Sequence, residues 1–92
     1  MLKLQLSKQF RKDLEKVKKR GLKIKKLDKV VLMLVEEKPL SPKYRDHALE
    51  TSRNYKGLRE CHVEPDWLLV YRIEKETVTL YLARTGTHSD LF

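Results

Sequence analysis

The chain has 92 residues and a net charge of +8, and the periodic recurrence of its hydrophobic residues (40%) among charged ones (37%) excludes a disordered protein. We expect a single domain over residues 1–92. The longest apolar run, Val30 to Val35, is far shorter than the roughly 20 residues that cross a bilayer, so no membrane partner is expected.

The N-terminal residues alternate in polarity, with Leu2, Leu4 and Leu6 separated by polar side chains. This period of two predicts a half-buried strand. The same alternation lacks the continuous apolar stretch of a signal peptide. The single cysteine, Cys61, excludes an internal disulfide and fits a reducing compartment. Together these features predict a cytoplasmic protein.

Two helices are expected next, joined at Gly21. Ser7 can cap the first, and Gly21 would end it in a left-handed conformation. The buried face of this helix would carry Phe10, Leu14 and Val17. The second helix is expected to end at Lys38, before Pro39. Its apolar stripe consists of Ile24, Leu27, Val31, Leu34 and Val35. A helix-turn-helix DNA reader is disfavoured, because the middle of this second helix is too apolar for a major groove.

The excess positive charge lies in one segment, between Lys8 and Lys29. Eleven lysines and arginines accompany three acidic residues there, so the rest of the chain has no net charge. Such a run is either a solvated helical face or a polyanion-binding surface. If the segment binds RNA, we expect the contacts to come from Lys16, Lys19, Lys23 and Lys26.

Residues 39 to 54 show no clear period and predict an extended loop, with one turn near Tyr44 to Leu49. Three strands are expected after this loop, joined by turns short enough for antiparallel hairpins. They span Leu58 to Val63, Trp67 to Ile73 and Val78 to Arg84.

This order of elements predicts an α+β domain, in which an N-terminal strand and a two-helix hairpin precede three C-terminal strands. The helices would pack on one face of a mainly antiparallel sheet and leave the other face open. The open face would carry Tyr71 and Tyr81, if the neighbouring apolar residues point to the core. Those residues are Leu68, Val70, Leu80 and Leu82.

All three histidines, His47, His62 and His88, lie at loops or strand ends in the C-terminal half of the chain. Four further residues would fall near the same end of the sheet: Arg59, Asp66, Trp67 and Arg84. With Asp66 the histidines could bind a metal, but no two of them are spaced like a helical zinc pair. We therefore expect neither a metal nor another cofactor.

These residue types suit metal-free RNA cleavage. That reaction needs a base for the ribose 2′-hydroxyl, an acid for the departing 5′-oxygen and a cation for the phosphorane charge. Histidine suits the first two roles and arginine the third. Each residue alone also has a structural explanation, since Trp67 can be core and Asp66 a turn residue. Arg84 shares the strand parity of Leu80 and Leu82, so a bulge or twist must turn it out of the core.

Three blocks of the sequence resemble the YafQ branch of the RelE-like bacterial toxins, in the RelE/ParE superfamily. They are Asp46 to Leu49, Arg59 to Tyr71 and Arg84 to Phe92, in the order found in the family. The resemblance implies a RelE-like β-α-α-β-β-β fold and the toxin of a type II toxin-antitoxin system. That toxin would be a ribosome-dependent, metal-independent mRNA endoribonuclease. The connection from His47 to Leu58 is slightly longer than is usual and has Tyr55 where a tryptophan is common.

Carried over to this sequence, the resemblance implies that five residues take part in cleavage: His47, His62, Asp66, His88 and Phe92. Arg84 would bind the phosphate. We expect His88 to be the general acid, with His62 and Asp66 as the base or as the groups that orient it. Phe92 would stack on a base or hold the tail in place. Arg59 and Trp67 are expected to bind RNA.

The resemblance also implies three partners: the ribosome, mRNA and a small acidic antitoxin with a DNA-binding part of its own. Two other functions stay open, an RNA- or ribosome-binding protein that inhibits translation without cleavage and a ribosome-independent ribonuclease. A small metallohydrolase is a further alternative, and it would lose activity with a chelator.

Overall fold

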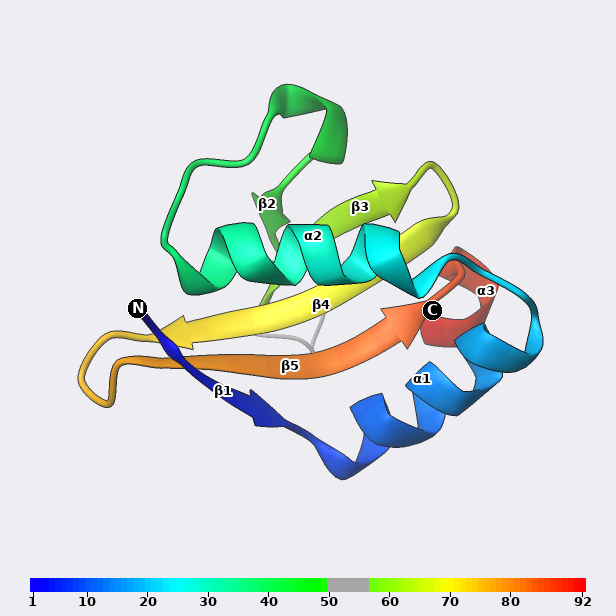
Figure 1. Cartoon of the computed structure of the whole chain (residues 1–92), viewed down its shortest axis with the longest axis horizontal. Coiled ribbons are helices and arrows are strands. Elements are labelled where there is room, and N and C mark those ends of the chain that lie inside the picture. Colours follow the sequence, from blue (N-terminus) through cyan, green and yellow to red (C-terminus); the bar gives the residue numbers. More distant parts are fainter. Residues whose placement is uncertain (50–56) are drawn as a thin grey trace.

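The computed structural model describes residues 1–49 and 57–92, so Tyr55 and most of its connection lie outside the described residues. In chain order the elements are β1 (Lys3–Leu6), α1 (Lys8–Lys19), α2 (Ile24–Val35), the 3-10 helix η1 (Pro42–Tyr44), β2 (His47–Ala48), β3 (Arg59–Glu64), β4 (Trp67–Glu74), β5 (Thr79–Gly86) and α3 (His88–Leu91) (Figure 1). Among the described residues, no helix has the length and apolar content of a membrane span.

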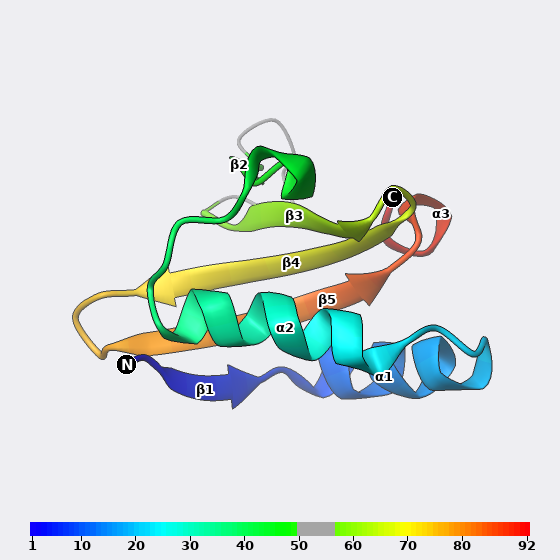
Figure 2. The same cartoon turned by 45° about the horizontal axis from the view of Figure 1, so that its top comes forward.

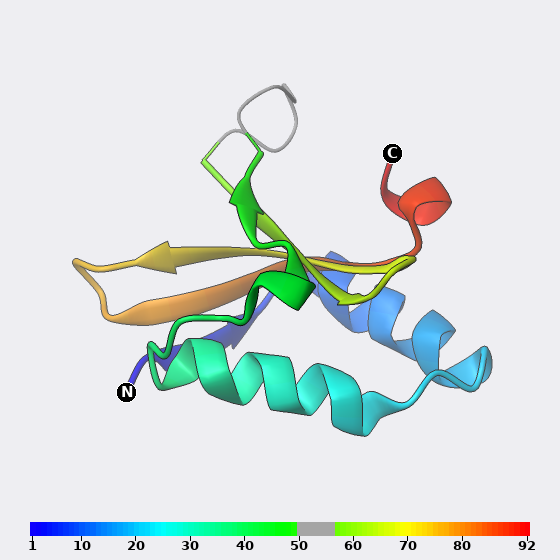
Figure 3. The ribbon, with the colours of Figure 1, turned by 90° about the horizontal axis from the view of Figure 1, so that it is seen from above.

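The strands form one sheet in the order β1-β5-β4-β3-β2, in which β1 runs parallel to β5 and the other pairs are antiparallel. Helices α1 and α2 lie on one face of this sheet, while α3 lies on the other (Figures 2 and 3). The predicted α+β fold is confirmed. The short elements η1, β2 and α3 were not predicted. Leu4 of the edge strand β1 is 52% exposed, although its parity predicted burial.

Hydrogen bonds to terminal backbone groups mark the start of α1 and the end of α2. Ser7 caps α1 as predicted, because its hydroxyl accepts the Phe10 N–H at 2.8 Å. Gly21 follows α1 with a left-handed φ of 78°, also as predicted. Helix α2 ends at Val35, so the prediction of an end at Lys38 was wrong. Glu37 is already left-handed there, and the Lys38 N–H bonds back to the Met33 carbonyl at 2.9 Å.

Strand β4 is buried on both faces, and its side chains point to the faces opposite to those expected from the sequence. Trp67, Leu69 and Tyr71 face α1 and α2, whereas Leu68 and Val70 pack on the opposite side of the sheet. The prediction that Tyr71 lies on an open face was therefore wrong. Leu68 and Val70 instead belong to a second, smaller core with Leu49, Ala83 and Leu91. That second core attaches α3 to the sheet.

A bulge in β5 changes the direction of the side chains that follow it. Val70 pairs with Arg84 and Tyr71 with Leu82, so Ala83 is an extra residue in β5. Arg84 consequently follows the parity of Val70 rather than that of Leu82. The bulge that the sequence required for turning Arg84 out of the helix-side core is present.

A buried carboxylate on α1, Asp13, binds the part of β5 beyond the bulge. The Arg84 guanidinium donates to it through Nε at 2.7 Å and Nη2 at 3.1 Å, and the Thr85 N–H donates at 3.2 Å. Only 3% of Asp13 is exposed. Strand β1 pairs with β5 no further than Leu82, so Asp13 supplies an acceptor where the neighbouring strand has ended.

The C-terminal helix α3 is fixed mainly through Asp90. Its carboxylate accepts the Thr87 N–H at 2.9 Å, while the Thr87 hydroxyl accepts the Asp90 N–H at 3.2 Å, which forms a capping box. Arg20, at the end of α1, donates to both Asp90 oxygens. Gly86 leaves room for this arrangement, because a Cβ there would come within 2.8 Å of Asp90 Oδ2. The Arg20 guanidinium and the Thr87 amide hold the pKa of Asp90 well below its usual range.

Replacing Asp13 by alanine is expected to destabilise the fold by about 1–3 kcal/mol, because the substitution removes the acceptor for the Thr85 N–H and for Arg84. Chemical denaturation measures this change. Asp28→Ala, at an exposed position of α2, is the matched control and should shift the free energy of unfolding by at most about 0.5 kcal/mol. Equal effects of the two substitutions would contradict the stabilising role of Asp13.

Replacing Asp90 by asparagine is expected to lower the melting temperature at pH 7, since the neutral amide weakens the bond to Arg20. The folded-state pKa is lowered, so the carboxylate contributes its full stability above the ordinary value of about 4 and loses it as the pH falls further. The difference from the wild type should therefore narrow only below about pH 4. Thermal unfolding between pH 2 and 7 measures this difference in melting temperature, with the exposed Glu76→Gln as control. A difference that stays constant with pH would show that the charge of Asp90 does not contribute to stability.

Candidate active site

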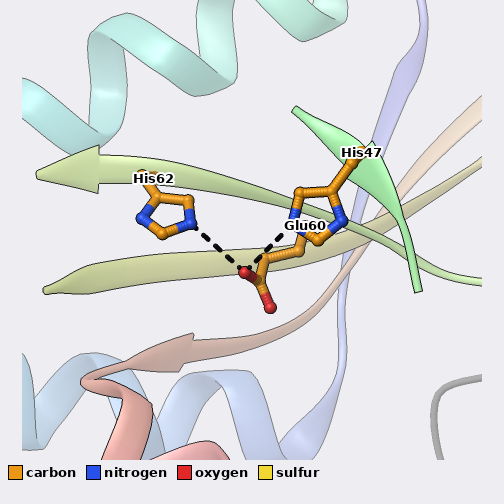
Figure 4. Close-up of side chains that lie close together, drawn as sticks. All are labelled: His47, Glu60 and His62. Carbon is orange, nitrogen blue, oxygen red and sulfur yellow. Dashed lines mark ion pairs between the residues drawn. The ribbon is translucent and has the colours of Figure 1, made fainter. Parts of the chain in front are cut away.

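A carboxylate between two imidazoles forms the centre of the site. Strand β3 directs Glu60 and His62 to the same face, and β2 pairs with β3 so that His47 lies directly opposite Glu60. His47 Nε2 is 3.4 Å and His62 Nε2 is 3.3 Å from the same oxygen, Glu60 Oε1 (Figure 4). The Glu60 side chain is only 6% exposed, whereas the His47 side chain is 52% exposed.

Backbone carbonyls orient both imidazole rings. His62 Nδ1 lies 3.2 Å from the Pro65 carbonyl, and His47 Nδ1 lies 3.2 Å from the Ala48 carbonyl. Because a carbonyl only accepts hydrogen bonds, each Nδ1 carries the proton in these contacts. Nε2 of each ring faces the carboxylate, and the hydrogen bond there needs one further proton, on Nε2 or on Glu60. This arrangement allows protons to pass between Glu60 and either ring.

A groove of about 460 Å³ brings these residues together with the C-terminal tail. It is lined by Arg45, His47, Leu49, Glu60, His62, His88 and Phe92. The groove lies on the side of the sheet opposite α1 and α2, where Figure 3 shows α3 and the C-terminus. The His88 and Phe92 rings contact each other, with centroids 5.1 Å apart. Four of the residues that the sequence singled out, His47, His62, His88 and Phe92, are thus neighbours.

Sequence reasoning missed two residues of this groove, Glu60 and Arg45. Glu60 stands two positions before His62 in a predicted strand, and this spacing places both on one face. This spacing could therefore have identified Glu60 from the sequence. Arg45 ends η1 in a left-handed conformation, with φ of 50°, and it was hidden in a segment expected to be a loop.

Asp66 and Arg84 do not line the groove. Asp66, in the turn between β3 and β4, accepts the backbone N–H of His88 at 3.3 Å, so it positions the start of α3. Arg84 does not line the groove, and its guanidinium is bound to Asp13. Among the described residues, the arginine that lines the groove is Arg45.

Trp67 is a core residue, so the expectation that it binds RNA is corrected. Its side chain is 1% exposed, and Nε1 donates to the Thr85 hydroxyl at 2.9 Å, which leaves no ring face for a base. Trp67 is buried because the start of β4 lies in the apolar core between the sheet and the helices.

Arg59 lies on the helix-side face, away from the groove, and supports the segment that carries His47. It donates to Asp46 at 2.9 Å, and the Tyr71 hydroxyl donates to the same carboxylate. Burial, together with the hydrogen bond to Asp46, raises the pKa of the Tyr71 phenol. The hydrogen bond to Asp46 likewise raises the pKa of Arg59. Asp46 precedes His47 directly, so this network fixes the start of β2.

The four lysines expected to bind RNA are exposed, as a binding role requires. Lys16 and Lys19 belong to α1 and Lys23 precedes α2, in the helical layer on the other side of the sheet from the groove. Lys26 differs from these three, because it lines a separate cavity and pairs with Glu64 at 3.5 Å.

The central triad, His47, Glu60 and His62, also has the composition of a metal site. One ligand atom from each residue lies within 4.8 Å of the others. Two imidazoles and a carboxylate suit zinc or copper. Glu60 and His62, two positions apart on strand β3, supply the close pair of ligands that the spacing of the three histidines lacks.

Comparison with known proteins gives a consistent family. The sequence profile described as "Bacterial toxin of type II toxin-antitoxin system, YafQ" matches residues 2–92. The mRNA interferase toxin YafQ of Escherichia coli (strain B / BL21-DE3) is 40% identical over 90 residues, which cover 97% of this chain and 94% of that protein. Among solved structures, a metal-bound toxin from Helicobacter pylori is 51% identical, with a TM-score of 0.91 and all of both chains covered.

A second solved structure is the E. coli DinJ-YafQ complex, in which YafQ is 39% identical to this chain. The similarity has a TM-score of 0.88 and covers 100% of this chain and 99% of the other. The resemblance noted from three sequence blocks is thereby confirmed over nearly the whole length. This chain belongs to the YafQ family of bacterial toxins from type II toxin-antitoxin systems.

Proposed function

We propose that this toxin is an mRNA endoribonuclease that cuts messages on the ribosome by attack of a ribose 2′-hydroxyl. The observation that carries the proposal is the groove that Glu60, between two histidines, lines together with His88. A base and an acid on opposite sides of one phosphate are what this reaction needs. The name of the E. coli relative, an mRNA interferase toxin, supports the same activity.

In the proposed reaction, Glu60 and its histidine partners act as the base. They take the proton of the 2′-hydroxyl, whose oxygen then forms a bond to the adjacent phosphorus. The bond from phosphorus to the 5′-oxygen breaks, and His88 gives that oxygen its proton. The products are a 2′,3′-cyclic phosphate and a 5′-hydroxyl.

Two further residues complete this assignment. Arg45 neutralises the charge that develops on the phosphorane, because it is the guanidinium that lines the groove. Phe92, half exposed beside the His88 ring, provides a surface on which a base can stack. Asp66 positions His88 by accepting the backbone N–H of His88, and it does not touch the substrate.

The proposal includes an antitoxin as partner. YafQ of E. coli forms a complex with DinJ, and a positively charged toxin suits an acidic partner. We expect this antitoxin to cover the groove and to carry its own DNA-binding part. Four exposed lysines would then contact ribosomal RNA when the antitoxin is absent: Lys16, Lys19, Lys23 and Lys26.

Substituting the acid or the base should slow cleavage strongly while leaving the fold intact. His88→Ala and Glu60→Gln are each expected to reduce the cleavage rate by about 10²- to 10⁴-fold, the usual contribution of a general acid or base. Primer extension on a defined message in a reconstituted translation system, with and without ribosomes, measures this rate. Glu76→Gln, in the turn distant from the groove, should cleave like the wild type.

Each alternative function predicts a different result in the same assay. Inhibited translation without cuts by the wild type would establish a binding protein and refute the endoribonuclease. Cuts of free RNA at the same rate as on ribosomes would instead establish a ribosome-independent ribonuclease. Full cleavage activity of Glu60→Gln would show that Glu60 is not part of the general base.

Metal ions offer a separate test, because the Helicobacter pylori relative is a metal-bound toxin and the central triad fits a metal. A bound ion would occupy the carboxylate and imidazole atoms that the proposed base uses. We therefore expect cleavage to persist in EDTA and to fall when Zn²⁺ or Cu²⁺ is added. Loss of activity in EDTA that added metal restores would instead establish a metallohydrolase.

A further inference from the structure

A second cavity, of about 470 Å³, lies beside the groove at the edge of the sheet. It is lined by Lys26, Lys29, Lys43, Tyr44, Arg45, His62, Val63, Glu64 and Pro65. Strand β2 pairs only with Arg59 and Glu60, so it does not cover the later part of β3. The cavity therefore opens along the exposed edge of β3, between η1 and the first half of α2.

The charge of this cavity is strongly positive. Four cationic side chains line it against one carboxylate, Glu64, which pairs with Lys26 at 3.5 Å. Lys43 is held over the ring of the buried Tyr44, with its Nζ 5.1 Å from the ring centroid. In the described part of the chain, neither Lys29, Lys43 nor Arg45 forms an ion pair. The cavity thus has positive charge available for an anion.

The cavity and the groove share two lining residues, Arg45 and His62. The left-handed backbone at Arg45 is uncommon for a residue with a side chain, and it places Arg45 at the boundary of both spaces. An extended polyanion in the groove can therefore continue into the cavity. A nucleic acid strand has this form, with one negative charge on each successive phosphate.

We propose that this cavity binds an RNA phosphate on the 5′ side of the scissile bond. The direction follows from the proposed function, on which this inference rests. His88 serves the departing 5′-oxygen, so the downstream nucleotide lies toward α3. Glu60 and His62 serve the 2′-hydroxyl of the upstream nucleotide, and the cavity lies beyond His62 on that same side.

Replacement of single phosphates in a short RNA tests the subsite. The RNA carries a 2′-O-methyl group at the cleavage position, which prevents cutting, and one neutral methylphosphonate placed in turn at each linkage. For the wild-type toxin, we expect binding to weaken by about five- to tenfold when the neutral linkage is just upstream of the cleavage position. In Lys29→Ala/Lys43→Ala, the same replacement should have no effect, because the charge that it would oppose is absent.

The matched control is Lys12→Ala/Lys18→Ala, which removes the same charge from exposed positions of α1 outside the cavity. This variant should retain the full effect of the upstream methylphosphonate. An effect confined to downstream linkages, an unchanged effect in the cavity variant, or no binding of the unmodified RNA at low salt would overturn the subsite. This experiment measures binding of an RNA that cannot be cleaved, whereas primer extension measures cleavage. Failure of the subsite and failure of the proposed function can therefore be distinguished.

Discussion

The single extra residue in β5, Ala83, determines where the C-terminal tail lies. Before the bulge, Leu80 and Leu82 face the helices. After it, Thr85 takes that side and bonds Trp67, while Arg84 follows the opposite parity and its guanidinium reaches Asp13 of α1. The strand then continues to Gly86 and leads into α3 on the opposite side of the sheet from α1 and α2. Without the bulge the parity of every later residue would be reversed. His88 and Phe92 would then not line the groove with Glu60.

Two carboxylates outside the groove stabilise this arrangement, and both link α1 to the end of the chain. Asp13 binds β5 directly after the bulge, and Asp90 joins α3 to Arg20. The first helix therefore supports the groove from the other side of the sheet. Among the basic residues at the end of α1, Arg20 is bound to the tail, while the neighbouring lysines remain exposed.

Burial of Glu60 is unfavourable for stability, but it creates surroundings that are typical of functional sites. A carboxylate that is 6% exposed is unfavourable unless charged or polar partners compensate for its lost hydration. Its partners here are two imidazoles rather than a permanently charged arginine. Such an environment is typical of functional sites, because it keeps a proton acceptor available without neutralising it permanently.

The architecture followed from the sequence because the strongest signals were periodic or conformational. Ser7, Gly21 and the alternating N-terminus defined a strand and a helix start and end that the structure confirms. Strand β4 was ambiguous in orientation, since five successive residues from Trp67 are buried and no polar position marks a face. Asp13 was hidden for a similar reason, because a carboxylate within a lysine-rich helix looks like part of its solvated face.

The site was predictable only where residue identity alone carried the chemistry. Three histidines and Phe92 stood out by type and by resemblance, whereas Glu60 and Arg45 depend on three-dimensional pairing. The two-residue strand β2, which has too short a pattern to detect, sets His47 opposite Glu60 and leaves the rest of the β3 edge open. The same short strand thus completes the triad and exposes the basic cavity. A message that follows both would bend around this edge, from the histidines toward the lysines of η1 and α2.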